Sequence, residues 1–147
     1  MGLIEETNEL MLDWNKLSDM SRENHVIPVA VQNMDTKEVI LIAYINKQAL
    51  EESIRLKKVV LWSTSRNKLW FKGQESGNTF TLHRIFVNCE QNSLVFMATP
   101  DKENICHTSY KGIPNNCYYR ELDMDTMKLI NLNEEREKYN DRISGNI

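Results

Sequence analysis

With 147 residues, the chain has the length of one domain and can bury a substantial core. Hydrophobic residues make up 41% and charged residues 27%, and no apolar run approaches the roughly 18 residues of a membrane span, which excludes a transmembrane helix and a membrane partner. The net charge of -3 offers no broad basic surface, so nucleic acid is not expected as a partner.

The N-terminus and the cysteines indicate a cytoplasmic protein. Nothing at the N-terminus combines basic residues, an apolar core and a small-residue cleavage site, so we expect no signal peptide. Thiols stay reduced in the cytosol, and the odd number of cysteines, three, also argues against a disulfide framework.

The first part of the chain predicts a helix and a β-hairpin. Residues 3–17 place apolar side chains at helical intervals behind two early glutamates, which is typical of a short amphipathic helix. Residues 26–32 and 38–44 are rich in β-branched residues and flank a turn-like cluster, so we predict two paired strands. Both runs are apolar almost throughout, which predicts strands that are buried on two faces.

A central helix is predicted after this hairpin. Asn46 is a suitable N-cap for a helix that runs to about Lys58, and Glu51 can pair with Arg55 one turn later. The predicted core face consists of three side chains: Ala49, Leu50 and Ile54.

The second half of the chain predicts more strands and one long loop. The strand-like runs are residues 59–63, 79–87, 93–98 and 117–122, the last of which would be the final strand. Residues 79–87 and 93–98 flank the Cys89 stretch, which would be the turn region between these two paired strands. Residues 99–116 contain two prolines and a glycine and predict a long loop, which in a compact domain is usually functional or disordered. Residues 123–147 carry a charge run and predict a helical C-terminal extension. The predicted fold class is α+β, a sheet-rich single domain over residues 1–147 with a central helix.

The loop at residues 72–78, Lys72-Gly73-Gln74-Glu75-Ser76-Gly77-Asn78, has two interpretations. Its glycines can expose backbone N–H groups beside a lysine, and such a loop can bind a phosphate. The same composition is common in plain hairpin loops.

The three cysteines and one histidine suggest a metal site. Cys89, Cys106 and Cys117 could supply three thiolates to zinc, which leaves the fourth position of a catalytic site for water, and His107 follows the second cysteine directly. In an extended segment Cys89 would point to one face, and the other face would carry three polar side chains: Asn88, Glu90 and Asn92. Alternatively, the cysteines are small buried hydrophobes without a chemical role.

Several ordered motifs resemble one enzyme family. The run Trp-Phe-Lys-Gly-Gln-Glu-Ser-Gly-Asn at residues 70–78 resembles the W-x-K-G-E-T-S-G-N signature of phosphoribosyl-AMP cyclohydrolase, and residues 62–70 resemble the segment before that signature. Shorter matches follow in family order at residues 12–14, 27–32, 43–46, 49–50 and 105–107. The resemblance covers about residues 12–120.

The resemblance implies a fold, a reaction and two metals. In that family one cysteine of an Asp-Cys-Asp-x-Asp motif and two later cysteines bind zinc at the interface of an intertwined homodimer, and the first cysteine comes from the opposite subunit. By position these are Cys89, Cys106 and Cys117. The family reaction hydrolyses the N1 to C6 bond of the purine ring in phosphoribosyl-AMP, a step of histidine biosynthesis, and it also requires magnesium.

Two departures from the family pattern concern the metals. The family's three aspartates correspond to Asn88, Glu90 and Asn92, so one carboxylate remains, and we expect a protein-only magnesium site to be severely weakened. Ten residues separate Cys106 from Cys117, where the family usually has six. Because this longer loop costs only about 0.5 kcal/mol of closure entropy, zinc binding should survive it.

These features together predict a zinc-dependent hydrolase of a purine-type nucleotide. Histidine titrates near neutral pH, so His107 is the candidate acid or base; alternatively, it is an ordinary loop histidine. The candidates for binding the substrate and its phosphates are Arg66, Lys68, Lys72, Glu75, Ser76, Gly77 and Asn78. The basic residues among them could instead be solvated surface charges.

Two other functions remain open at this stage. A divergent cyclohydrolase or deaminase could act on another purine-type nucleotide, which the missing aspartates favour. A non-catalytic, zinc-stabilised dimer could merely bind a nucleotide, although a structural zinc usually has a fourth protein ligand.

Overall fold

The computed structural model describes residues 7–9, 25–75, 77–102 and 116–132. Contacts within the chain divide it into two compact units, one of residues 15–117 and one of residues 1–14 together with 118–147. The described part of the chain contains more strand than helix, which confirms the sheet-rich α+β class. The prediction of a single domain stays a prediction.

A six-stranded sheet forms the larger unit. Its strands are β1 (Ile27–Asn33), β2 (Val39–Ile45), β3 (Val60–Ser63), β4 (Lys68–Phe71), β5 (Phe80–Val87) and β6 (Leu94–Pro100), in the order β4-β3-β2-β1-β6-β5. β1 and β6 are parallel, and the other neighbours are antiparallel. The predicted β1–β2 hairpin and the pairing of the strands around Cys89 are therefore confirmed.

The sheet curls so that β5 reaches the segment that precedes β3. The N–H of Val59, just before β3, donates to the carbonyl of Phe80 at 3.2 Å, and the N–H of Leu82 donates to the carbonyl of Lys57 at 2.9 Å. These bonds connect β5, at one edge of the strand order, to the segment that precedes β3. The curled sheet surrounds a core of fully buried side chains that includes Val29, Val31, Leu61, Phe80 and Phe96.

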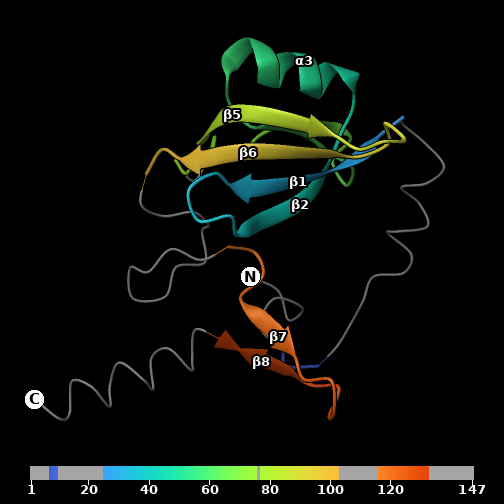
Figure 1. Ribbon diagram of the computed structural model, residues 1–147, viewed down its shortest axis with the longest axis vertical. Coiled ribbons are helices and arrows are strands. Elements are labelled where there is room, and N and C mark those ends of the chain that lie inside the picture. Colours follow the sequence, from blue (N-terminus) through green and yellow to red (C-terminus); the bar gives the residue numbers. More distant parts are fainter. Residues whose placement is uncertain (1–6, 10–24, 76, 103–115, 133–147) are drawn as a thin grey trace, which may run out of the picture. The chain divides into compact units, whose positions relative to one another are not determined.

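The helix α3 (Lys47–Leu56) lies on one side of this sheet (Figure 1). The predicted N-cap is confirmed, because the Asn46 side chain accepts the N–H of Ala49 at 2.8 Å. The helix ends two residues before the predicted Lys58, with Lys57 in the left-handed conformation at φ 55°. Among the described residues α3 is the one helix longer than a single turn, and no helix there is long and apolar enough to cross a membrane.

Two predictions about side chains of α3 are wrong. Ile54 is 45% exposed, whereas Ser53 is fully buried, and its hydroxyl accepts the N–H of Val60 at 3.0 Å and donates to the Val60 carbonyl at 2.8 Å. The helix is thus attached to β3 by hydrogen bonds at a position where an apolar contact was expected. Arg55 pairs with Glu52 at 2.6 Å instead of with Glu51, because the Glu52 carboxylate is in reach at a spacing of three residues.

The hairpin strands are buried on one face, so the prediction of burial on two faces is also wrong. β1 alternates between buried and partly exposed residues, and Ile42 of β2 is 57% exposed. Ile42 pairs with Ala30, so both side chains lie on the face of the sheet opposite to Val29 and Val31. The apolar sequences of β1 and β2 therefore do not mean that both faces of these strands are buried within this chain.

The smaller unit contains a second hairpin, formed by β7 (Arg120–Leu122) and β8 (Leu129–Asn131). β8 follows β7, so the strand predicted at residues 117–122 is not the last one. The helix predicted for residues 123–147 is wrong where β8 forms, and residues 133–147 lie outside the described part. The Asp123 carboxylate accepts the N–H groups of Asp125 at 2.8 Å and Thr126 at 3.2 Å, which closes a turn where a helix was expected.

Residues 7–9 belong to this hairpin and are not helical, which corrects the helix predicted for residues 3–17 at these positions. The carbonyl of Asn8 accepts the N–H of Leu129 at 2.9 Å, and the carbonyl of Thr7 accepts from the Arg120 guanidinium at 2.8 Å. The rest of that predicted helix lies outside the described residues.

Asp101 connects the end of β6 to two other parts of the larger unit. Its carboxylate accepts from the Lys58 ammonium and the Thr79 hydroxyl, both at 2.6 Å, and from the Thr81 hydroxyl. Partial burial alone would raise the pKa of Asp101, but these three hydrogen bonds outweigh it and hold the pKa below its ordinary value of 3.8.

Asp101→Asn should make the free energy of unfolding vary less with pH in the acidic range. A depressed pKa means that the carboxylate contributes stability above its unfolded pKa and loses that contribution as the pH falls below 3.8 toward the folded pKa. We expect the variant to be less stable by about 1 kcal/mol or more near pH 7, measured by urea unfolding, and to approach the wild type as the pH falls further below 3.8. Asp35→Asn, at the exposed β1–β2 turn, is the control. Parallel stability curves for wild type and Asp101→Asn would contradict this account.

Candidate functional site

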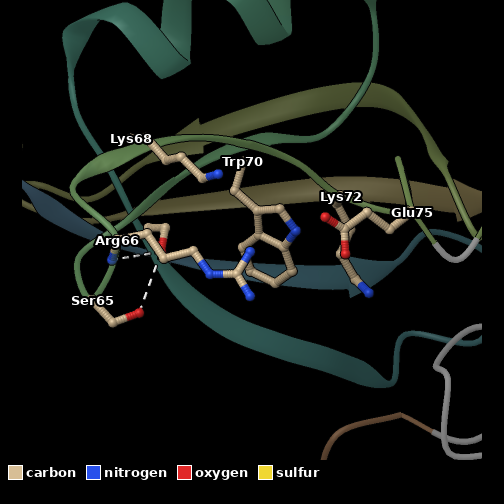
Figure 2. Close-up of a pocket in the computed structure, with 8 residues that line it drawn as sticks. Ser65, Arg66, Lys68, Trp70, Lys72 and Glu75 are labelled. Atoms are coloured by element: carbon tan, nitrogen blue, oxygen red, sulfur yellow. Dashed lines mark hydrogen bonds between the residues drawn. The ribbon is translucent and has the colours of Figure 1, made fainter.

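A cavity of about 470 Å³ opens beside the β3–β4 hairpin and the loop after it (Figure 2). Its lining consists of Ser63, Ser65, Arg66, Lys68, Trp70, Lys72, Gly73 and Glu75. Four of the predicted substrate-binding residues, Arg66, Lys68, Lys72 and Glu75, therefore meet in one cavity. Gly77 and Asn78 are not part of its lining, and Ser76 lies outside the described residues.

Strand alternation places these side chains on one face of the hairpin. Lys68 pairs with Ser63 across the hairpin, and Trp70 follows Lys68 two residues later, so all three side chains point to the same side. The turn between the strands has Asn67 in the left-handed conformation at φ 54°, and the N–H of Arg66 donates to the Ser63 hydroxyl at 3.2 Å. The hairpin thus builds most of the cavity from local pairing.

Lys72 extends this row into the interior of the unit. Its N–H donates to the carbonyl of Val59 at 3.1 Å, and its side chain is only 8% exposed. The ammonium lies 5.6 Å from the ring centroid of Trp70 and 5.7 Å from that of Phe80, a cation–π arrangement. The ion pairs found among the described residues do not include Lys72. A buried cation without a carboxylate partner is available for an anionic ligand.

The loop after Lys72 is folded tightly on itself. Gly73 has φ +88°, and a Cβ atom there would lie 2.1 Å from the backbone of Asn78, so only glycine fits. The N–H of Gly77 donates to the Gly73 carbonyl at 2.8 Å. This amide is engaged within the loop, as in a plain turn, and the described loop residues that line the cavity are Lys72, Gly73 and Glu75.

The predicted metal ligands are described only in part. Cys89 lies in the turn between β5 and β6, and Cys117 follows the undescribed residues 103–115; both are exposed. The N–H of Cys117 donates to the carbonyl of Ile40 on β2 at 2.8 Å. Cys106 and His107 lie outside the described residues, and within the described ranges no three His, Cys, Asp or Glu side chains are grouped closely enough to hold a metal ion.

Comparison with known sequences identifies the family. A family model described as phosphoribosyl-AMP cyclohydrolase matches residues 41–119, a segment that includes the whole cavity lining and all three cysteines. The chain belongs to the phosphoribosyl-AMP cyclohydrolase family. This confirms the resemblance that the motifs indicated and places the chain in a family of hydrolases.

Curated relatives carry the same name and match most of the chain. The protein from Nitrosopumilus maritimus is 38% identical over 104 residues, which cover 71% of this chain and 92% of the relative. The protein from Chlorobaculum tepidum is 33% identical over 130 residues, 88% of each chain. The protein from Methanothermobacter thermautotrophicus is 32% identical over 127 residues, 86% of this chain and 88% of the relative.

The segment that carries Cys89 is a turn between β5 and β6, as the flanking strands predict, so the alternation of side chains that an extended segment would give is not found there. Gln91 has φ 55°, and the Asn88 side-chain oxygen accepts the N–H groups of Asn92 at 2.9 Å and Ser93 at 3.0 Å. The three polar side chains still converge, because the Asn92 side chain accepts from the Asn88 amide at 2.6 Å and donates to the Glu90 carboxylate at 3.2 Å. Hydrogen bonding within the turn brings them together, where a shared strand face was expected.

The sequence prediction missed four residues of the cavity: Ser63, Ser65, Trp70 and Gly73. Trp70 could have been found from its place two residues after Lys68 and two before Lys72, because alternate residues of a strand share a face. Ser63 depends on the cross-strand register with Lys68, for which the sequence gives no direct signal.

The composition of this turn predicts weak magnesium binding. The Asn88 amide donates to the Asn92 side-chain oxygen, and the Asn92 amide donates to Glu90. Glu90 supplies the only formal charge of the three, whereas divalent affinity rises with the number of charged ligands. We expect calorimetric titration with magnesium chloride to show a millimolar dissociation constant or no binding, and Asn88→Asp with Asn92→Asp to tighten it. Gln91→Glu adds charge to the same turn outside this cluster and serves as the control. Micromolar binding by the unmodified protein would contradict the prediction.

Proposed function

We propose that this protein is a phosphoribosyl-AMP cyclohydrolase, which hydrolyses the N1 to C6 bond of the purine ring in histidine biosynthesis. The observation that carries the proposal is the cavity itself, where Arg66, Lys68 and Lys72 surround an aromatic ring within the segment that matches the family. A substrate with a purine ring and phosphates needs both kinds of contact. Cations and charge-assisted hydrogen bonds hold phosphates, and a flat aromatic side chain accommodates a base.

The reaction requires a water molecule and a proton carrier. Water adds to C6, the C6–N1 bond breaks with its electron pair going to N1, and N1 keeps a proton, so that C6 becomes the carbon of a carboxamide. A tetrahedral centre forms at C6 before the bond breaks, and N1 must be protonated to leave. We assign the proton transfer to His107, since histidine titrates near neutral pH and follows Cys106 directly.

We further propose that Cys89, Cys106 and Cys117 hold zinc. Thiolates are preferred zinc ligands, and the two cysteines that the structure describes are exposed at a turn and at a chain segment outside the strands, where a metal could reach them. When bound, zinc supplies Lewis acidity and a nucleophile at neutral pH. The proposal includes a homodimer in which Cys89 comes from the opposite subunit, and a cytoplasmic location that keeps the thiols reduced.

A second candidate is the same hydrolytic chemistry on another purine-type nucleotide. The amide side chains of Asn88 and Asn92 favour it, because they bond to each other in a turn where the family pattern has carboxylates for magnesium. A nucleotide whose phosphates bring their own magnesium would not depend on those carboxylates. Turnover of phosphoribosyl-AMP, with and without magnesium, decides between the two candidates and a protein that binds nucleotides without reaction.

Purified protein should turn over phosphoribosyl-AMP, and His107→Asn should reduce kcat by about 100-fold or more, the usual contribution of a positioned acid or base. The variant should retain its metal, measured by elemental analysis on the same sample. His83→Asn is the control, since His83 is an exposed residue of β5 bonded to Thr99. No turnover of phosphoribosyl-AMP under any metal condition would reject the proposed function, and unchanged turnover in His107→Asn would remove His107 from the mechanism.

Each protomer should contain one zinc ion, and the ion should be lost when Cys89, Cys106 or Cys117 is replaced by serine, because a hydroxyl is a poor substitute for a thiolate. If Cys89 bridges two subunits, Cys89→Ser should also weaken the dimer in sedimentation measurements. Ser93→Ala is the control, because it changes a side chain next to the same turn and keeps the backbone N–H that donates to Asn88. Full zinc content in Cys106→Ser would refute the ligand assignment.

A further inference from the structure

The cations of the cavity are divided between its two ends. Figure 2 shows Arg66 and Lys68 on one side of the Trp70 indole, and Lys72 with Glu75 on the other. Lys68, Trp70 and Lys72 alternate along one extended segment, because the N–H of Lys72 continues the β3–β4 pairing to Val59. At about 3.3 Å per residue, the two lysine Cα atoms are about 13 Å apart, with Trp70 midway between them. The indole of Trp70 thus separates the cations of the two ends.

The two ends also differ in their surroundings. Arg66 and Lys68 are exposed, whereas Lys72 is 8% exposed and lies between the rings of Trp70 and Phe80. Lys72 takes part in none of the ion pairs of the described residues, although the residue as a whole is buried. A buried cation without an anionic partner is costly, and a ligand phosphate would provide the missing partner.

Trp70 occupies the space between these ends. It is 40% exposed and lines the cavity, so a large flat surface is offered to a ligand. An aromatic side chain between two cationic groups matches a ligand in which a heterocyclic base separates two phosphates. Glu75, at the Lys72 end, cannot favour a phosphate, but its carboxylate can accept from a ribose hydroxyl next to one.

We propose that Trp70 is the stacking platform for the substrate's base, and that the cations at the two sides of its ring, Arg66 with Lys68 and Lys72, each bind a different one of two phosphates. The inference rests on the proposed function and goes beyond it, because it assigns specificity for doubly phosphorylated nucleotides to named residues. A nucleotide with one phosphate fills one end of the cavity and leaves the other cation without a partner.

The test compares two ligands in a set of variants by isothermal titration calorimetry. The ligands are phosphoribosyl-AMP and AMP, which lacks the second phosphoribosyl group, and all proteins carry His107→Asn so that the proposed reaction is slow. Lys68→Met and Lys72→Met remove one cation from each end. Lys47→Met is the control, because the Lys47 side chain is 90% exposed on α3 and is not part of the cavity lining.

We expect one of the two lysine variants to lower the affinity for phosphoribosyl-AMP by about tenfold and the affinity for AMP by less than about twofold. The other lysine variant should lower the affinity for both ligands by about tenfold. Trp70→Ala should weaken both ligands by about tenfold, and Trp70→Phe, which retains a ring, should restore most of the affinity. If Trp70→Ala does not fold, Trp70→Leu keeps apolar bulk without a flat ring and should weaken both ligands in the same way.

Two results would overturn the proposal. Identical ligand profiles for Lys68→Met and Lys72→Met would show a single phosphate site, and unchanged affinity in Trp70→Leu would remove the stacking platform. The same measurements distinguish failure of this inference from failure of the proposed function. If the protein with His107 intact turns over phosphoribosyl-AMP normally but the variants do not show the expected affinity changes, only the binding inference is rejected. If the expected affinity changes are found but the protein does not turn over phosphoribosyl-AMP, the cyclohydrolase function is rejected and the binding assignment stands.

Discussion

The backbone of Val59 joins the two edges of the larger unit. Its N–H donates to Phe80 on β5, and its carbonyl accepts from Lys72, which follows β4. Through this residue the hairpin that builds the cavity is fixed to the opposite end of the curled sheet, and Lys72 is held against the ring of Phe80. β4 is an edge strand that pairs only with β3, and the bond from Lys72 to Val59 extends that pairing to the residue that is also bonded to β5.

The cavity is therefore assembled from neighbours in sequence but held by partners distant from them. Ser63, Lys68 and Trp70 are brought together by the β3–β4 register alone. Lys72 and Gly73 need more, because Lys72 depends on Val59 and Gly73 on a contact with Asn78 that excludes any side chain. The local register and the distant contacts together place the buried Lys72 in the same cavity as the exposed Arg66 and Lys68.

Local signals in the sequence predict local features well. The Asn46 cap, the β1–β2 hairpin and the strands on both sides of Cys89 follow from residue preferences within a few positions, and the structure has all of them. Features that depend on distant partners were not predictable in this way. Burial of Ser53 depends on the backbone of Val60, and residues 7–9 pair with β8 because Asn8 meets Leu129. The family motif found Lys72 and Glu75, but the role of Trp70 in the cavity only becomes evident from the alternation along β4.

In the turn around Cys89, two of the three polar side chains are the neutral amides of Asn88 and Asn92. Carboxylates at those two positions would repel each other and the Glu90 carboxylate. Three carboxylates at these positions would hold the turn under electrostatic strain until a cation arrived, so its shape would depend on ion concentration and acidity. Asn88 and Asn92 bond to each other as neutral groups, and Asn88 also caps two backbone amides. The loop that carries the exposed Cys89 thiol is consequently held in its shape by its own side chains.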